Sequence, residues 1–180
     1  EEKMSGAYNL KELYQGTVLH EGYPRNCIFF HPEQGTKLKE LLGYAGTQLS
    51  IYMPTFRGTS SSVQEEDYVN QIKDYLNRVD ILLHENQIML VKLHPFVQSQ
   101  LTLEGYDTYE VLNACDVLIT DYSSVMYDFA VTGRRILLFA YDLEYYQGSR
   151  GMYEDISDYP FPLVRTPDEL VKELNTDSGH

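Results

Sequence analysis

The sequence has no tryptophan, only two cysteines and few cationic side chains. It holds 14 Lys and Arg against 27 Asp and Glu in 180 residues, which gives a formal net charge of −13. Sequence-independent nucleic-acid binding relies on clustered cations that neutralise phosphates, so this balance argues against a nucleic-acid partner. A small anionic ligand stays compatible with it, because a local site can oppose the net charge of the whole chain.

Several site patterns are also absent. Cys27 and Cys115 lie far apart and have no metal-ligand spacing, and Cys115 sits in an apolar segment as a small hydrophobic residue. We therefore expect a reducing, cytoplasmic compartment and no metal. The chain has no P-loop and no GxGxxG motif, which excludes the common nucleoside-triphosphate and dinucleotide fingerprints. No apolar run reaches the roughly 18 residues of a membrane-spanning helix.

Short apolar runs separated by helical patterns organise most of the chain. The apolar runs lie at 49–54, 87–95, 116–122 and 135–141. The last three are nearly continuous, which is typical of strands buried on both faces of a parallel sheet. The helical patterns lie at 64–85, 108–115, 124–133 and 166–175. This alternation predicts an α/β fold with a doubly wound, Rossmann-like parallel sheet, in a single domain over residues 1–180.

Two serines follow the third predicted strand and precede a predicted helix, in Asp121-Tyr122-Ser123-Ser124. Ligands of such sheets bind outside the carboxyl ends of the strands, where this segment is expected to lie. Serine hydroxyls there can donate to phosphate oxygens, and they can equally cap the helix. Capping alone and anion binding both stay open as interpretations of Ser123 and Ser124.

Other polar residues also follow predicted strands. His94 is held extended by Pro95 and is a candidate general base or phosphate ligand, although a lone histidine is more often structural. Arg57 follows the first strand and suits phosphate recognition, unless it forms an ordinary ion pair. Arg150 and Gly151 predict a loop that brings backbone close to a ligand, with an exposed turn as the alternative.

Acidic residues flank the serine pair. Asp121, which follows Thr120, is expected to fix the turn. Asp128 comes four residues after Ser124, so the two share a helix face. A carboxylate would repel a phosphate, so Asp128 is expected to orient a neighbouring side chain or a sugar hydroxyl.

Taken together, these segments resemble the CDP-glycerol glycerophosphotransferase family of teichoic-acid primases and polymerases. The resemblance covers roughly residues 20–160. The matching segments are GYPRN at 22–26, YMPTFRGT at 52–59, VKLHP at 91–95, DVLITDYSSVMYDFA at 116–130, FAYDLEYY at 139–146 and RGMYED at 150–155. The Asp-Tyr-Ser-Ser-x-x-x-Asp run is fairly specific when it is combined with Lys-x-His-Pro.

The resemblance implies one half of a GT-B-type fold, the C-terminal domain that binds the CDP-alcohol donor, with an N-terminal half absent. It implies transfer of glycerol phosphate, or another polyol phosphate, to a hydroxyl of a lipid-linked or glycan acceptor, with release of CMP. The resemblance also implies that the reaction takes place at the inner face of the cell membrane and needs no cofactor. His94 and Arg57 would be catalytic. The donor-binding residues would be Pro95, Thr120, Asp121, Ser123, Ser124, Asp128, Arg150 and Gly151.

One position departs from the family pattern: Cys27 follows GYPRN, where the family usually has Asp. Two other functions stay open. A GT-B glycosyltransferase would hold the diphosphate of a nucleotide sugar at the same helix start. In a non-catalytic binding module, Ser123 and Ser124 would only cap the helix.

Overall fold

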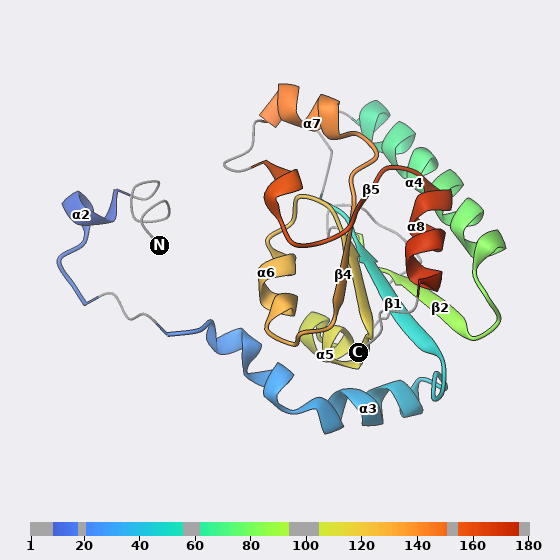
Figure 1. The fold of residues 1–180 in the computed structure, drawn as a ribbon. Helices are drawn as coiled ribbons and strands as arrows, with labels where there is room; N and C mark the ends of the chain where they lie inside the picture. The colour runs from blue at the N-terminus through green and yellow to red at the C-terminus, as the bar shows by residue number, and fades with distance from the viewer. Residues whose placement is uncertain (1–8, 18–20, 56–61, 94–104, 151–154, 177–180) are drawn as a thin grey trace.

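A computed structural model describes residues 9–17, 21–55, 62–93, 105–150 and 155–176. Its centre is a five-stranded sheet with helices packed on both faces, as Figure 1 shows. Residues 9–17, with the short helix α2, lie apart from the sheet.

The strands and helices alternate along the chain as the apolar runs predict. The strands are β1 (Gln48–Met53), β2 (Gln87–Val91), β3 (Val117–Thr120), β4 (Arg135–Phe139) and β5 (Leu163–Val164). The α-helices are α2 (Leu10–Leu13), α3 (Pro32–Leu41), α4 (Ser62–Leu82), α5 (Thr108–Ala114), α6 (Val125–Ala130), α7 (Leu143–Arg150) and α8 (Pro167–Asn175). Two 3-10 segments are η1 (Pro24–Phe30) and η2 (Ile156–Asp158).

The sheet has the strand order β2-β1-β3-β4-β5, and every neighbouring pair is parallel. From β1 the chain passes through α4 to the outer strand β2, then crosses to β3 on the other side of β1. This is a doubly wound arrangement, so the predicted α/β class with a parallel sheet is confirmed.

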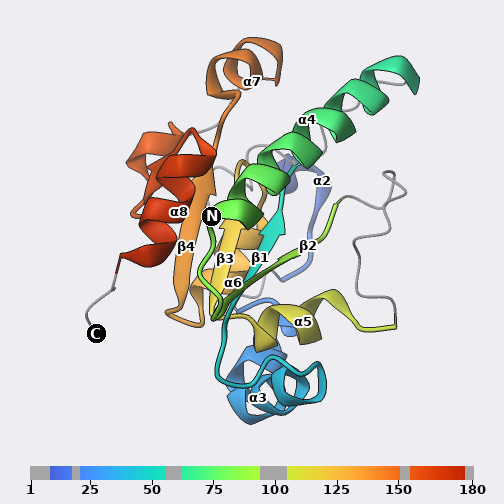
Figure 2. The same ribbon diagram turned by 90° about the vertical axis from the view of Figure 1, so that its right-hand side faces the viewer.

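Alternate residues of each strand feed two separate cores. On one face, Leu118 of β3 and Ile51 of β1 pack against α3, α5 and α6. On the other, Val117 and Ile119 pack against α4 and α8. In Figure 1, α6 lies on one side of the sheet and α4 and α8 lie on the other; Figure 2 looks at the molecule from the side of α4 and α8. Because both faces are covered, β3 is buried along its whole length, which explains its continuous apolar sequence.

Local signals set several helix ends. Thr166 caps α8 by accepting a hydrogen bond from the Glu169 N–H, and Pro167 is the first helical residue, as the sequence Thr-Pro predicts. Asp107 and Glu110 form a reciprocal capping box at the start of α5. Gly133 follows α6 with a φ of 67°, a conformation that glycine adopts without the Cβ penalty.

Two elements differ from the sequence prediction. The sequence predicts a loop around Arg150, but Leu143–Arg150 form helix α7, whose first turn is closed by the Tyr146 N–H bonding to the Asp142 carbonyl. The run Leu143, Tyr146 and Arg150 has helical spacing, which the glycines nearby obscure. Strand β5 is only two residues long, too short for a periodic pattern to reveal it.

Helix α3 packs closely against α5 at Gly35. A Cβ built on Gly35 would lie 2.6 Å from the carbonyl carbon of Asn113 and closer still to its oxygen. The Asn113 side chain also donates to the His31 carbonyl at the start of α3, at 2.9 Å. The two helix backbones are therefore in direct contact.

Gly35→Ala is expected to lower the free energy of unfolding by about 1–3 kcal/mol. The reason is that the added methyl group overlaps the backbone of Asn113, which cannot rotate away as a side chain could. Urea unfolding measures the loss. Gly148→Ala in α7 is the matched control, since its Cβ meets nothing within 4 Å; it is expected to stabilise slightly, by up to about 1 kcal/mol. Equal stability of the two variants would contradict this packing.

Candidate functional site

Strands β1 and β3 lie side by side, and the chain leaves them toward opposite edges of the sheet. In open parallel sheets this is the switch point, and the crevice outside the carboxyl ends of the two strands is where ligands bind. Thr55 follows β1, and the segment Asp121–Ser124 follows β3. The serine pair predicted from the sequence therefore lies at the switch point.

Asp121 joins the two sides of the switch point. Its carboxylate accepts hydrogen bonds from the Thr55 N–H at 2.9 Å, from the Thr55 hydroxyl at 2.6 Å and from the Tyr122 N–H at 2.6 Å. The residue is 0% exposed. This buried carboxylate fixes the loop after β1 against the turn after β3, as expected from its position.

Thr120 adds a second link. Its hydroxyl donates to the Met53 carbonyl at 2.7 Å, and the side chain is fully buried. Thr120 and Asp121 therefore shape the edge through bonds to the backbone of the neighbouring strand and its loop.

The serines do less capping than their position suggests. Ser124 occupies the N-cap position of α6 but has helical backbone angles, and its side chain makes no capping hydrogen bond. Ser123 accepts from the Val125 N–H, over a long 3.4 Å. Ser124 is exposed and Ser123 half-buried. Helix capping therefore explains little of why two serines occupy positions 123 and 124.

Asp128 lies one turn into α6 and is only 2% exposed. Tyr109 donates its hydroxyl to Asp128 Oδ2 at 2.8 Å, and Arg25 contacts both carboxylate oxygens, with Nε 3.3 Å from Oδ1 and Nη2 3.0 Å from Oδ2. Burial and the bond to Asp128 raise the pKa of Tyr109 to about 12, so its proton stays in place. The sequence alone indicates no role for Arg25, although Arg25 lies in the GYPRN segment.

The edge continues to the carboxyl end of β4. The Tyr122 hydroxyl donates to Asp142 at 3.1 Å, and the Tyr122 ring stacks on Tyr146 of α7 with centroids 3.8 Å apart. The ends of β1, β3 and β4 are thus connected through Asp121, Tyr122 and Asp142.

Four predicted site residues, Arg57, His94, Pro95 and Gly151, lie outside the described residues. Arg150 is the last residue of α7, and its side chain is also outside them. Their roles stay predictions from the sequence.

Within the described ranges, His, Cys, Asp and Glu side chains form no group of three or more that is suited to a metal ion. The same ranges contain no helix with both the length and the apolar character needed to cross a membrane.

Comparison with known proteins identifies relatives. The sequence is 31% identical over 180 residues to a teichoic acid poly(glycerol phosphate) polymerase of Bacillus spizizenii, covering 90% of this chain and 45% of the relative. It is 29% identical over 163 residues to a teichoic acid glycerol-phosphate primase of Bacillus subtilis, covering 82% of this chain and 40% of the relative. The chain thus spans less than half the length of these relatives.

Solved structures agree. The wall teichoic acid polymerase TagF superposes with a TM-score of 0.74 at 27% identity, over 93% of this chain and 45% of that one. A TagF variant soaked with CDPG gives a TM-score of 0.70 over 94% of this chain. The sequence model of the family described as CDP-glycerol:poly(glycerophosphate) glycerophosphotransferase matches residues 2–180. The predicted resemblance is confirmed: the chain belongs to the CDP-glycerol:poly(glycerophosphate) glycerophosphotransferase family.

Proposed function

We propose that this chain binds the donor of a glycerophosphotransferase reaction, CDP-glycerol or a related CDP-polyol, at the carboxyl ends of β1 and β3. The observation that carries the proposal is the serine pair at the switch point. Ser124 makes no capping bond and Ser123 only a long one, so both hydroxyls are available as donors to phosphate oxygens. The family description and the TagF variant soaked with CDPG support the same donor.

The proposed site combines residues of two kinds. Thr120 bonds to Met53 at the end of β1, and Asp121 holds Thr55 in the loop that follows. The sequence adds Arg57, His94 with Pro95, and Arg150 with Gly151 as the groups that meet the donor diphosphate. Guanidinium groups suit this role because their planar donors match phosphate geometry.

The proposed reaction transfers polyol phosphate in one displacement. An acceptor hydroxyl attacks the β-phosphorus of the donor, forming a new P–O bond while the P–O bond to CMP breaks. His94 takes the proton of the attacking hydroxyl, and the arginines stabilise the charge on the phosphate oxygens. Such a reaction requires chiefly the positioning of the reactants and stabilisation of the developing charge.

The remaining partners follow from the relatives. We propose a lipid-linked or glycan acceptor, because the relatives are named as teichoic acid primases and polymerases. They are more than twice as long as the matched segment, so an N-terminal half is proposed to form the opposite wall of the cleft. The complete enzyme would act in the cytoplasm, peripherally at the inner face of the membrane.

The double variant Ser123→Ala with Ser124→Ala tests the site. We expect at least about tenfold weaker binding of CDP-glycerol, since a hydrogen bond to a charged group contributes about 1.5–3 kcal/mol. The melting temperature should change little, because the capping bond that is lost is long. Isothermal titration of the full-length protein, together with thermal unfolding, measures both effects.

Thr36→Ala with Thr176→Ala is the matched control. Both hydroxyls are exposed and bond to carbonyls of their own helical turn, in α3 and at the end of α8. This control should bind CDP-glycerol as the wild type does. A serine variant that melts at a lower temperature but binds the donor normally would show that the serines only cap α6.

A further inference from the structure

Arg25 is held differently from the other arginines whose side chains the structure describes. Arg134 and Arg135 bond to carbonyls of neighbouring helices or to Glu173, and Arg78 and Arg165 form ion pairs with exposed carboxylates. The partner of Arg25 is instead a buried carboxylate: the Asp128 side chain is 3% exposed, whereas that of Arg25 is 48% exposed. The buried Asp128 carboxylate therefore holds one edge of the Arg25 guanidinium group, and the side chain is still about half exposed to solvent.

The contacts fix the orientation of the guanidinium group. Nε and Nη2 face the two oxygens of Asp128, a side-on arrangement that uses one edge of the planar fork. The Tyr23 ring lies 4.6 Å below the guanidinium carbon, and the Tyr109 ring lies 5.9 Å away. Tyr109 also bonds to Asp128, so one tyrosine holds both members of the ion pair. The Nη1 donors point away from the carboxylate and stay available for a second anion.

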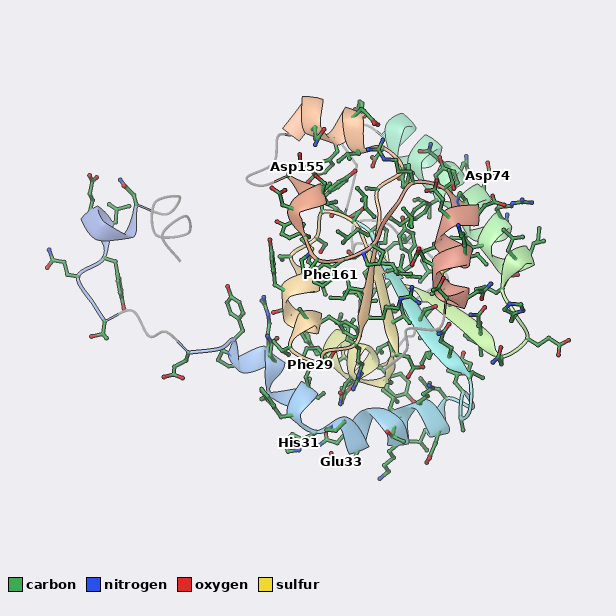
Figure 3. All side chains as sticks on the ribbon, viewed as in Figure 1. Phe29, His31, Glu33, Asp74, Asp155 and Phe161 are labelled. Carbon is green, nitrogen blue, oxygen red and sulfur yellow. The ribbon has the colours of Figure 1, made fainter. Side chains whose placement is uncertain are left out.

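The segment that carries Arg25 is itself fixed to the fold. Phe29, labelled in Figure 3, packs against Tyr109 of α5 with ring centroids 5.9 Å apart and against Phe129 of α6 with centroids 6.2 Å apart. Phe29 is buried, and η1 is in contact with α5. Because these aromatic contacts already attach η1, the Arg25–Asp128 pair is not needed as the tether.

The location connects Arg25 with the serine pair. Asp128 follows Ser124 by four residues, so both lie on one face of α6, separated by roughly 6 Å along its axis. Side chains in a helix tilt toward its N-terminus, so the Asp128 carboxylate leans toward the end that carries Ser124. A diphosphate at the serines would lie about one helical turn from the carboxylate that holds the guanidinium group.

We infer that Arg25 binds the donor diphosphate directly, and that Asp128 and Tyr109 act as positioning residues that aim its guanidinium group. This inference rests on the proposed function and names a further binding residue of that site. It also gives Asp128 a role that avoids the repulsion between a carboxylate and a phosphate. The phosphate meets the cation, and the carboxylate stays behind it.

The test compares Arg25→Ala, Arg25→Lys and the control Arg78→Ala in the full-length protein. Arg78 pairs with Asp168 on the outside of α4, on the opposite face of the sheet. Isothermal titration with CDP-glycerol should show affinity about 10- to 150-fold lower for Arg25→Ala, the loss expected for hydrogen bonds to a charged group. Arg25→Lys should recover part of it, because lysine keeps the charge without the fork, and Arg78→Ala should bind as the wild type does.

A second variant covers the case in which Arg25→Ala does not fold, since that change leaves Asp128 buried without its cation. Arg25→Ala with Asp128→Asn removes both charges and keeps an acceptor for Tyr109. It should fold and still bind CDP-glycerol at least about tenfold more weakly than the wild type. Wild-type affinity in a folded Arg25 variant would overturn the role of Arg25 while leaving the proposed function intact. A folded wild-type protein that does not bind CDP-glycerol would overturn the proposed function itself.

Discussion

Replacing Asp121 with alanine is expected to lower the free energy of unfolding by about 2–5 kcal/mol and the transfer rate by about a hundredfold. The change removes the acceptor of the part-buried hydrogen bonds from the Thr55 and Tyr122 N–H groups, and each unsatisfied donor costs about 1–3 kcal/mol. The loop after β1 would then shift relative to β3, and a displacement of about 1 Å is enough to reduce a rate a hundredfold. Urea unfolding and a transfer assay on the full-length protein measure the two effects.

Asp168→Ala is the matched control for this change. Asp168 also accepts hydrogen bonds, but its partner is the exposed side chain of Arg78. Removing the Asp168 carboxylate should therefore lower the free energy of unfolding by at most about 1 kcal/mol. Asp121→Asn should fall between alanine and the wild type, because an amide oxygen still accepts from Thr55. An Asp121→Ala protein as stable as the control would show that Asp121 does not hold the switch point.

His94→Ala is expected to reduce transfer of polyol phosphate by at least about 10²–10³-fold, with little change in melting temperature. His94 directly follows Leu93, and the preceding Lys92 N–H still bonds to the Tyr52 carbonyl at 2.9 Å. Lys92 and Leu93 therefore follow the carboxyl end of β2, the edge of the sheet that also carries the serines, and His94 is the next residue in the sequence. A transfer assay with saturating CDP-glycerol isolates the effect on the chemical step.

His84→Ala is the corresponding control, since His84 is exposed and precedes β2 at the opposite end of the strand. It should keep wild-type activity. If His94→Ala transferred polyol phosphate at the wild-type rate, His94 would be a structural residue and the proposed proton transfer would be wrong.

The sheet was predictable because strands buried on both faces have nearly continuous apolar sequences. Leu118 and Ile119 are neighbours in β3, yet they belong to different cores, so both must be apolar. Helix α7 was not predictable in the same way, since Gly148 and the polar residues around it favour a loop by composition. Its helical state depends on packing, with Leu143 buried and Tyr146 stacked on Tyr122.

The candidate site was predictable as a location and less so as a set of contacts. The switch-point rule and the serine pair indicate the edge formed by β1 and β3. The bond between Asp121 and Thr55 joins residues 66 positions apart, and the pair Arg25–Asp128 joins residues 103 positions apart. One sequence contains no signal for such pairings. The first arises only when β1 and β3 lie side by side, and the second only when η1 packs against α5 and α6.

The most direct test of the central claim is a thermal-shift titration of the folded full-length protein with CDP-glycerol, CDP and a UDP-sugar. We predict that CDP-glycerol stabilises the protein by about 2.7 kcal/mol at a concentration of 100 times Kd, that CDP stabilises it as well, and that the UDP-sugar has no effect. If no cytidine nucleotide stabilises the protein, or if the UDP-sugar stabilises it more than CDP-glycerol does, the donor assignment is wrong.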